Sequence, residues 1–247
     1  MDNEFKPALI IVDLQEDFCP PVSLFMLAPF YRSGALAVAE GRSIAPIIND
    51  LLRLPFVKKI ATKDFHPPDH VSFASNHPEP HNKPFTSFVT IPNPNNPNET
   101  HTSRLWPIHC VQGTPGAELI PELDTPLVDL VIEKGQDSRV EMYSAFEAPF
   151  RHPIVKEASS KLAQSLKEAG VTDVFVVGLA MDYCVQSTAI DAVAEGFKTY
   201  VISEATKAVD PSEQGWRKTE KECDNAGVKF IALAGKELAK VRSMQDV

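Results

Sequence analysis

Hydrophobic residues along this chain occur in two alternating patterns, short continuous runs and longer stretches with helical spacing. The runs are rich in Val, Ile and Leu and are too short for helices, so they indicate strands that are buried on both faces of a sheet. We predict strands at residues 8–12, 57–62, 127–132, 174–177, 199–202 and 228–233. Spacing of three and four residues predicts helices at residues 34–54, 154–169 and 211–225 and a further helix that begins near residue 181.

Strands that alternate with helices predict one parallel sheet with helices on both faces. The expected fold class is therefore α/β, a three-layer α/β/α arrangement around a mostly parallel six-stranded sheet, in a single domain over residues 1–247. Residues 74–104 break the alternation, because they hold many Pro, Asn, Ser and Thr residues and little periodicity. They predict a long loop, which in a compact domain is usually functional or mobile.

The charge balance narrows the choice of partners. A net charge of -9 and a pI near 5.3 argue against nucleic acid and anionic membranes, since both select basic surfaces, and favour a neutral or cationic small molecule. No apolar run is long enough to span a bilayer, and residues 1–4 lack the basic and apolar regions of a signal peptide. The four cysteines are far apart without a CxxC pair, which fits reduced thiols. We therefore expect a cytoplasmic or nuclear protein.

Three chemically reactive residues follow predicted strands. Asp13 comes after the first strand, Lys134 closely follows the third, and Cys184 lies near the first turn of the helix after the fourth. The carboxyl ends of parallel strands meet at one crevice, where ligands bind. A thiol, a carboxylate and an ammonium there are suited to amide hydrolysis, with Asp13 as the base for the thiol. The helix start is expected to lower the pKa of Cys184.

Each of these residues also has an ordinary structural interpretation. A free cysteine is more often a small buried hydrophobe than a nucleophile. An aspartate after a strand often caps a helix or a turn, and a lysine at a strand end is ordinarily a surface charge. The three positions alone leave both interpretations open.

A histidine-rich region follows the second strand. Asp64 and His66 are two apart in an extended segment, so their side chains point to the same side and could bind one metal ion. Six of the seven histidines fall between residues 66 and 109. Because a mononuclear site takes three or four protein ligands, most of these imidazoles are expected to be solvated loop residues.

Five segments together resemble a known family. They are 11–18 (IVDLQEDF), 63–67 (KDFHP), 105–114 (LWPIHCVQGT), 133–135 (EKG) and 178–185 (GLAMDYCV). On these segments the chain is similar, over nearly its whole length, to the isochorismatase-like cysteine hydrolases. The resemblance implies an Asp-Lys-Cys triad at Asp13, Lys134 and Cys184. It also implies one divalent metal ion, expected to be zinc, that is bound by Asp64, His66 and His109.

Within that family the chain is most similar to the nicotinamidases of the fungal type. The resemblance implies hydrolysis of nicotinamide to nicotinic acid and ammonia through a cysteine thioester, a step of NAD salvage. It implies that the pyridine ring ligates the metal through its nitrogen and lies between aromatic side chains, namely Phe18, Trp106 and Tyr183. An oxyanion hole would be formed by the N–H groups of Ala180 and Cys184, the first turned inward by a cis Leu179–Ala180 peptide bond.

Two other functions fit the same residues. One is a related cysteine amidohydrolase that acts on another heteroaromatic or carbamoyl substrate, and the other is a non-catalytic nicotinamide-binding sensor. The intact triad argues against the sensor, because a binding module has no use for a nucleophile with its base. A homo-oligomer and a monomer both remain open. The sequence departs from the family at Met181-Asp182 and in the long loop at 75–100, which concerns substrate access rather than the chemistry.

Overall fold

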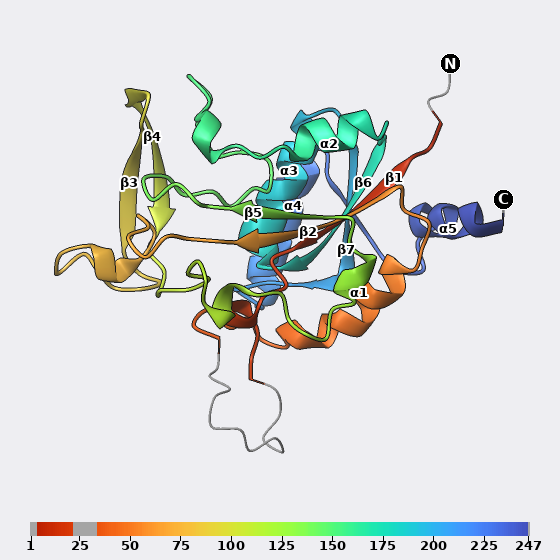
Figure 1. The fold of residues 1–247 in the computed structure, drawn as a ribbon, viewed down its shortest axis with the longest axis horizontal. Coiled ribbons are helices and arrows are strands. Elements are labelled where there is room, and N and C mark those ends of the chain that lie inside the picture. The colour runs from red at the N-terminus through yellow and green to blue at the C-terminus, as the bar shows by residue number, and fades with distance from the viewer. Residues whose placement is uncertain (1–3, 22–33, 247) are drawn as a thin grey trace.

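The computed structural model describes residues 4–21 and 34–246. Residues 1–3, which belong to the N-terminal segment that lacks signal-peptide features, lie outside this range. A six-stranded sheet in the order β5-β2-β1-β6-β7-β8 forms its centre, and every neighbouring pair is parallel (Figure 1). The strands are β1 (Pro7–Val12), β2 (Lys58–Asp64), β5 (Leu130–Lys134), β6 (Asp173–Leu179), β7 (Lys198–Lys207) and β8 (Lys229–Ile231). The predicted parallel six-stranded sheet is confirmed.

Helices cover both faces of this sheet. Leu9 and Ile11 of β1 pack in one core cluster with residues of α1 (Ala45–Leu52) and α5 (Lys236–Arg242). Ile10 and Val12 point the other way, into a second cluster with residues of α2 (Leu162–Glu168), α3 (Gln186–Ala194) and α4 (Glu213–Asn225). Alternate residues of one strand therefore bury themselves on opposite faces, which is why β1 is apolar without interruption.

The strand order reverses between β1 and β6. From β1 the chain adds β2 and β5 on one side, and β6, β7 and β8 follow on the other. In open parallel sheets the crevice at such a reversal, beyond the carboxyl ends of the strands, is where ligands bind. The ends of β1, β2, β5 and β6 all meet at this edge.

The expected loop at 74–104 is wrong over its second half. Residues 88–104 form an antiparallel hairpin, β3 (Phe88–Asn93) with β4 (Asn96–Arg104), that extends beside the main body (Figure 1). Proline is tolerated in edge strands, and both strands of this hairpin are edges, so the prolines obscured the pattern without preventing pairing. Ile91 turns inward and packs with Val140 and Phe150 in a small satellite core.

Several element boundaries also differ from the prediction. The helix expected at 34–54 begins only at Ala45, because residues 34–38 run alongside residues 17–18, where the Leu36 N–H donates to the Asp17 carbonyl at 2.9 Å. The helix at 154–169 is limited to α2, and the strand at 127–132 lies at 130–134. Helix α5 was not predicted.

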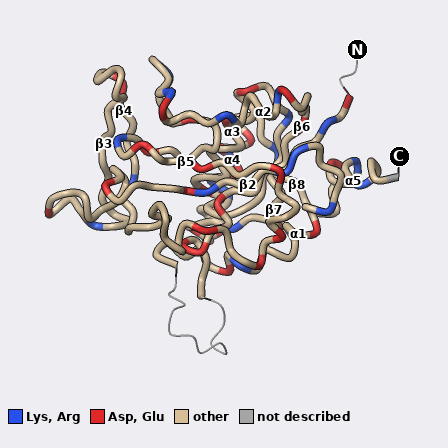
Figure 2. Tube along the Cα trace, viewed as in Figure 1, with Lys and Arg blue, Asp and Glu red and all other residues tan. Residues whose placement is uncertain are grey.

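Lys and Arg are interspersed among more numerous acidic residues (Figure 2). Within the described ranges no helix has the length and apolarity to cross a bilayer.

Candidate active site

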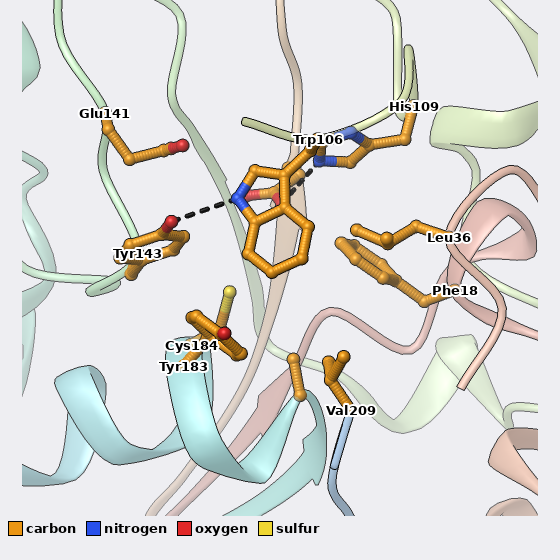
Figure 3. Close-up of a pocket in the computed structure, with 11 residues that line it drawn as sticks. Phe18, Leu36, Trp106, His109, Glu141, Tyr143, Tyr183, Cys184 and Val209 are labelled. Atoms are coloured by element: carbon orange, nitrogen blue, oxygen red, sulfur yellow. Dashed lines mark hydrogen bonds and ion pairs between the residues drawn. The ribbon is translucent and has the colours of Figure 1, made fainter. Parts of the chain in front are cut away.

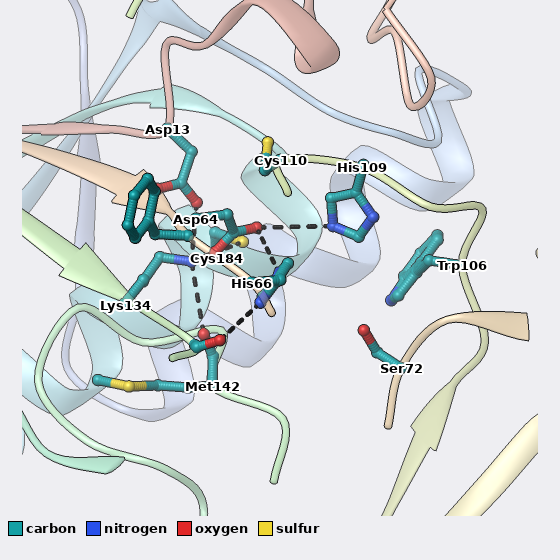
Figure 4. A network of polar contacts seen from close by, with 12 residues as sticks. Asp13, Asp64, His66, Ser72, Trp106, His109, Cys110, Lys134, Met142 and Cys184 are labelled. Carbon is teal, nitrogen blue, oxygen red and sulfur yellow. Dashed lines mark hydrogen bonds and ion pairs between the residues drawn. The ribbon is translucent and has the colours of Figure 1, made fainter. Parts of the chain in front are cut away.

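Four strand ends bring together the predicted catalytic and metal-binding residues. Asp13 follows β1, Asp64 ends β2, Lys134 ends β5, and Cys184 follows β6 by five residues (Figure 4). The Lys134 side chain is fully buried, with Nζ 2.9 Å from Asp13 Oδ2 and 3.6 Å from Cys184 Sγ. It also donates to Asp64 Oδ1. Lys134 therefore contacts both other residues of the expected triad, and carboxylate oxygens of Asp13 and Asp64 lie within 4.8 Å of Cys184 Sγ.

The buried ammonium of Lys134 is stabilised by two carboxylates. Burial alone lowers the pKa of a lysine, but the charges of Asp13 and Asp64 outweigh it and hold the Lys134 pKa well above its usual value. The Met142 carbonyl accepts a further hydrogen bond from Nζ at 3.4 Å. Lys134 is thus a permanent cation that links the nucleophile to the metal-binding residues.

Asp13 is fixed on one side and free on the other. Its Oδ1 accepts a hydrogen bond from Thr62 Oγ1 at 2.6 Å, and the same Thr62 oxygen accepts from the Asp13 N–H at 3.1 Å. Apart from the ion pair with Lys134, Oδ2 has no hydrogen-bond partner among the described residues. Burial raises the pKa of Asp13 against the opposing effect of Lys134. Oδ2 therefore keeps a lone pair and enough basicity to take a proton from the thiol.

Cys184 lies in a single turn of π-helix, Met181–Val185, which leads into α3. Before it, Ala180 adopts a left-handed conformation with φ 56° and ψ 57°. The Ala180 carbonyl accepts hydrogen bonds from the N–H groups of Tyr183 and Val185, on either side of Cys184. The close pairing of β6 with β1 also requires Gly178, because a Cβ there would lie 2.1 Å from the Val12 carbonyl oxygen.

Two expectations about this turn are wrong. The cis peptide bonds in the described chain are Glu79–Pro80 and His152–Pro153, so Leu179–Ala180 is trans, and the left-handed Ala180 makes the bend. The pKa of Cys184 is raised well above its usual value, because burial outweighs the favourable charge of Lys134. A helix start lowers a thiol pKa where water also reaches it, and this side chain is 3% exposed. The resting cysteine is therefore a neutral thiol that needs a base.

Asp64, His66 and His109 form a candidate metal site beside the triad. Their ligand atoms all lie within 4.8 Å of one another, and Asp64 Oδ2 is 3.6 Å from His66 Nε2 and 3.8 Å from His109 Nε2. Ligands that share one ion at about 2.1 Å lie roughly 3 to 3.5 Å apart, so only a small contraction is needed. Burial raises the pKa of Asp64, but Lys134 and His66 outweigh it and hold that pKa well below its usual range.

Backbone carbonyls fix the orientation of both imidazoles. His66 Nδ1 bonds the Gly135 carbonyl at 2.8 Å, and His109 Nδ1 bonds the Pro107 carbonyl at 2.8 Å. Because a carbonyl only accepts, each ring carries a proton on Nδ1 and directs Nε2 toward Asp64, the orientation expected of metal ligands. A Cβ at Gly135 would lie 2.4 Å from the His66 ring, so only glycine lets the carbonyl approach this closely. The donor set fits a divalent metal ion.

The other histidines of the region are less exposed than predicted. His70 is completely buried and stacks on His66 with ring centroids 4.1 Å apart. Its two nitrogens bond Ser72 Oγ at 2.8 Å and the Val140 carbonyl at 3.1 Å, so it supports His66 and has no free ligand atom. His77 and His101 are half-buried, which leaves His81 as the exposed imidazole of the cluster.

A small pocket opens directly above Cys184 (Figure 3). The cavity has a volume of about 20 Å³, room for roughly one water molecule, so its walls must move apart before an aromatic ring can enter. The predicted aromatic residues Phe18, Trp106 and Tyr183 line it, together with Ala180, Asp64 and His109. Trp106 meets Tyr183 edge to face, with centroids 4.9 Å apart. The pocket is therefore a narrow site with aromatic walls that lies beside the nucleophile.

Comparison with known proteins agrees with this geometry. The family model of the isochorismatase domain matches residues 7–223 of the chain. The chain belongs to the isochorismatase family. Among curated members of this family, the nicotinamidase of Acinetobacter baylyi is 44% identical over 82% of this chain and 82% of its own length. The nicotinamidase of Schizosaccharomyces pombe is 36% identical over 97% of this chain and 99% of its own.

Two solved structures of the isochorismatase family are also similar. A yeast nicotinamidase bound to the inhibitor nicotinaldehyde is 28% identical, with a TM-score of 0.78 over 92% of this chain and 99% of that one. A pyrazinamidase of Pyrococcus horikoshii in complex with zinc is 31% identical, with a TM-score of 0.65 over 92% of this chain and 99% of that one. The second structure supports a divalent metal site in this chain as well.

Sequence reasoning missed several pocket residues of this isochorismatase-family chain. They are Leu36, Glu141, Tyr143 and Val209. Leu36 was assigned to a helix, and Val209 follows β7 with no distinguishing pattern. Glu141 and Tyr143 lie in an irregular segment after β5, where the only signal was their closeness to Lys134. The pocket walls thus come mainly from connecting segments, whose positions depend on tertiary contacts.

Proposed function

We propose that this protein is a hydrolase that converts nicotinamide to nicotinic acid and ammonia, as a step of NAD salvage in the cytoplasm or nucleus. The observation that carries the proposal is the buried Asp13-Lys134-Cys184 cluster at the base of a pocket lined by aromatic side chains. The nicotinamidases of Acinetobacter baylyi and Schizosaccharomyces pombe, which are similar over most of this chain, support the same substrate.

The reaction begins with a proton transfer from the thiol. Cys184 gives its proton to Asp13 Oδ2 as its sulfur attacks the amide carbonyl carbon of the substrate. Lys134, 3.6 Å from the sulfur and 2.9 Å from the carboxylate, stabilises the negative charge wherever it lies along this transfer. Burial raises the pKa of Asp13, which makes its carboxylate a stronger base, and it raises the pKa of Cys184, so the proton leaves as the sulfur attacks rather than beforehand.

The protonated Asp13 then serves as an acid. It gives the proton to the amide nitrogen as the C–N bond breaks, so ammonia leaves and a thioester with Cys184 remains. A water molecule that loses a proton to Asp13 attacks the thioester. The C–S bond then breaks, Asp13 returns the proton to the departing sulfur, and the thiol is restored as the acid product leaves. The Asp13 carboxylate thus acts in both acylation and deacylation, through Oδ2, the oxygen that Thr62 does not occupy.

The oxyanion of each tetrahedral intermediate needs hydrogen-bond donors. We assign this role to the backbone N–H group of Cys184, because the bond that was expected to turn the Ala180 N–H inward is trans rather than cis. The hydrogen bonds that the Ala180 carbonyl accepts come from Tyr183 and Val185, which keeps the turn rigid around the Cys184 N–H. One such donor is typically worth about 3–4 kcal/mol of transition-state stabilisation.

Zinc is the metal that we propose for Asp64, His66 and His109. Two imidazoles and one carboxylate with further positions open is a common set for a working zinc site. When bound, such an ion would accept the pyridine nitrogen and so orient the ring between Phe18, Trp106 and Tyr183. The chain's own contribution is to fix the imidazoles through the Gly135 and Pro107 carbonyls, so that the site is formed before substrate arrives.

Replacing His66 with alanine is expected to remove the metal. A supporting residue alone changes metal affinity by about 10- to 100-fold, and a ligand counts for at least as much. Metal analysis of purified His66→Ala by mass spectrometry should therefore find less than about a tenth of the wild-type content. His81→Ala is the matched control, because it removes an exposed imidazole of the same region. Undiminished zinc in His66→Ala would show that the assignment is wrong.

Ammonia release distinguishes the proposed function from its alternatives. The wild-type protein should release ammonia from nicotinamide, and only weakly from benzamide, which lacks the ring nitrogen, or from N-carbamoylsarcosine. A chelator should suppress the reaction with nicotinamide. Preference for a carbamoyl substrate would favour a related amidohydrolase, and tight nicotinamide binding without ammonia would favour a sensor.

A further inference from the structure

We propose that the β3–β4 hairpin fixes the substrate-binding wall through Ser103 and Tyr143, which together position the indole of Trp106. Ser103 lies near the end of β4, and Tyr143 lies in the segment that follows β5. The proposal rests on the proposed function, in which Trp106 is one wall of the pyridine site. It gives the Pro- and Asn-rich insertion a defined part in substrate recognition.

Tyr143 joins two hydrogen bonds, and the direction of one of them is fixed. An indole N–H can only donate, so Trp106 Nε1 donates to the Tyr143 hydroxyl oxygen at 3.0 Å (Figure 3). The Tyr143 hydroxyl also bonds Ser103 Oγ, 2.8 Å away, and either hydroxyl can be the donor. The Ser103 hydroxyl can donate in turn to the Arg104 carbonyl at 3.4 Å. Removing either hydroxyl interrupts a chain that ends at the indole.

Burial makes these bonds important for the position of the ring. Trp106 is 3% exposed and Ser103 is 2% exposed, so water cannot replace a lost partner. The Tyr143 ring also packs against Tyr183, with centroids 5.5 Å apart, and Trp106 packs edge to face against the same ring. Tyr143 therefore touches one wall of the pocket and hydrogen-bonds the other. An unpaired buried indole N–H would turn or shift to find another acceptor.

The hairpin is attached firmly enough to act as a support. Its tip is bonded to the segment at 151–153, where Asn96 Nδ2 donates to the His152 carbonyl at 2.7 Å and Asn93 Nδ2 donates to the Pro153 carbonyl at 2.8 Å. Glu99 accepts from the backbone N–H groups of Arg151 and His152, which lowers its pKa to about 2. At its base, Ser103 pairs with Val89 across the hairpin.

The satellite core joins the same two segments. Ile91 of β3 packs there with Val140, Phe150 and Val155, which flank Tyr143 in sequence. The hairpin and residues 140–155 thus form one unit, which lies outside the two clusters that fill the main sheet. Because the two segments pack together, a change in the position of Ser103 is expected to move the Tyr143 side chain as well.

Steady-state kinetics test the arrangement. Tyr143→Phe keeps the ring and removes the hydroxyl, and Ser103→Ala removes the other end of the bond. We expect KM for nicotinamide to rise about three- to tenfold in Tyr143→Phe and less in Ser103→Ala, with kcat nearly unchanged, as for one neutral hydrogen bond. The double variant should match Tyr143→Phe, because both changes break the same chain. Thr102→Ala, an exposed neighbour on β4, is the matched control and should match the wild type.

Tryptophan fluorescence tests the arrangement without substrate. The chain has two tryptophans, so a Trp216→Phe background reports Trp106 alone. Loss of the indole hydrogen bond in Tyr143→Phe should shift its emission to shorter wavelength, and the Thr102→Ala control should not. Unchanged emission together with unchanged KM would overturn the proposal while leaving nicotinamide hydrolysis standing. A wild type that does not hydrolyse nicotinamide would instead refute the proposed function, and the emission would still decide the role of Tyr143.

Discussion

Replacing Cys184 with alanine is expected to lower kcat for nicotinamide by at least about four orders of magnitude. The loss is large because Cys184 is the one described thiol in contact with Lys134 and Asp13, so nothing else can form the thioester. Alanine keeps the Cβ in a buried, tightly packed turn and leaves the backbone donors in place. The melting temperature should therefore change little. Ammonia release and thermal unfolding, measured on the same preparation, check both statements.

Cys223 provides the matched control for this substitution. It is fully buried in α4, away from the pocket, and burial raises its pKa to about 12, as expected of a structural cysteine. Cys223→Ala should keep kcat and KM even if it unfolds at a somewhat lower temperature. Substantial turnover in Cys184→Ala would remove covalent catalysis from the account.

Replacing Lys134 with methionine is expected to abolish turnover and to cost about 3–5 kcal/mol of stability. Methionine has a similar length and no charge, so the substitution leaves the carboxylates of Asp13 and Asp64 buried without their cation. Denaturant unfolding measures the loss. Lys167→Met is the control, because Lys167 pairs with Glu195 at the surface, where an ion pair is worth about 0–1 kcal/mol.

The same variant should acquire a characteristic pH dependence. Burial raises the pKa of Asp13, and removing Lys134 takes away the charge that opposes this rise. A carboxyl whose folded-state pKa is raised contributes stability below its unfolded pKa and loses it as pH increases through the folded value. Lys134→Met should therefore be more stable near pH 5 than near pH 8. Equal stability at both values would contradict the assignment of Lys134 as the essential buried counter-ion.

The active-site residues were predictable from sequence because they depend on local pattern. Short apolar runs fix where the strands end, and in a parallel sheet those ends meet, so the hydrophobic pattern alone brings Asp13, Lys134 and Cys184 together. The hydrophobic pattern alone could not identify the metal ligands. Asp64 and His66 are neighbours in one extended segment, but His109 could be assigned only through the family resemblance, since five other histidines lie in the same region.

What could not be predicted depends on burial and on contacts between distant segments. The pKa of Cys184 depends on how deeply the fold buries the side chain. The position of a cysteine at the start of a helix gives no information on its burial. The bend at Ala180 uses a left-handed residue rather than a cis bond, a choice among several local solutions. Tyr143 enters the pocket because Ser103 and the hairpin hold it there, and no periodicity in the sequence encodes that contact.

Trapping of the acyl-enzyme tests the central claim most directly. Wild-type protein is mixed with nicotinamide, quenched with acid within one turnover, digested and analysed by mass spectrometry. We expect a nicotinoyl group on the peptide that contains Cys184, and no such adduct on the peptides with Cys19, Cys110 or Cys223. Turnover of nicotinamide with no adduct on Cys184 at any quench time, or with an adduct on another residue, would contradict the account.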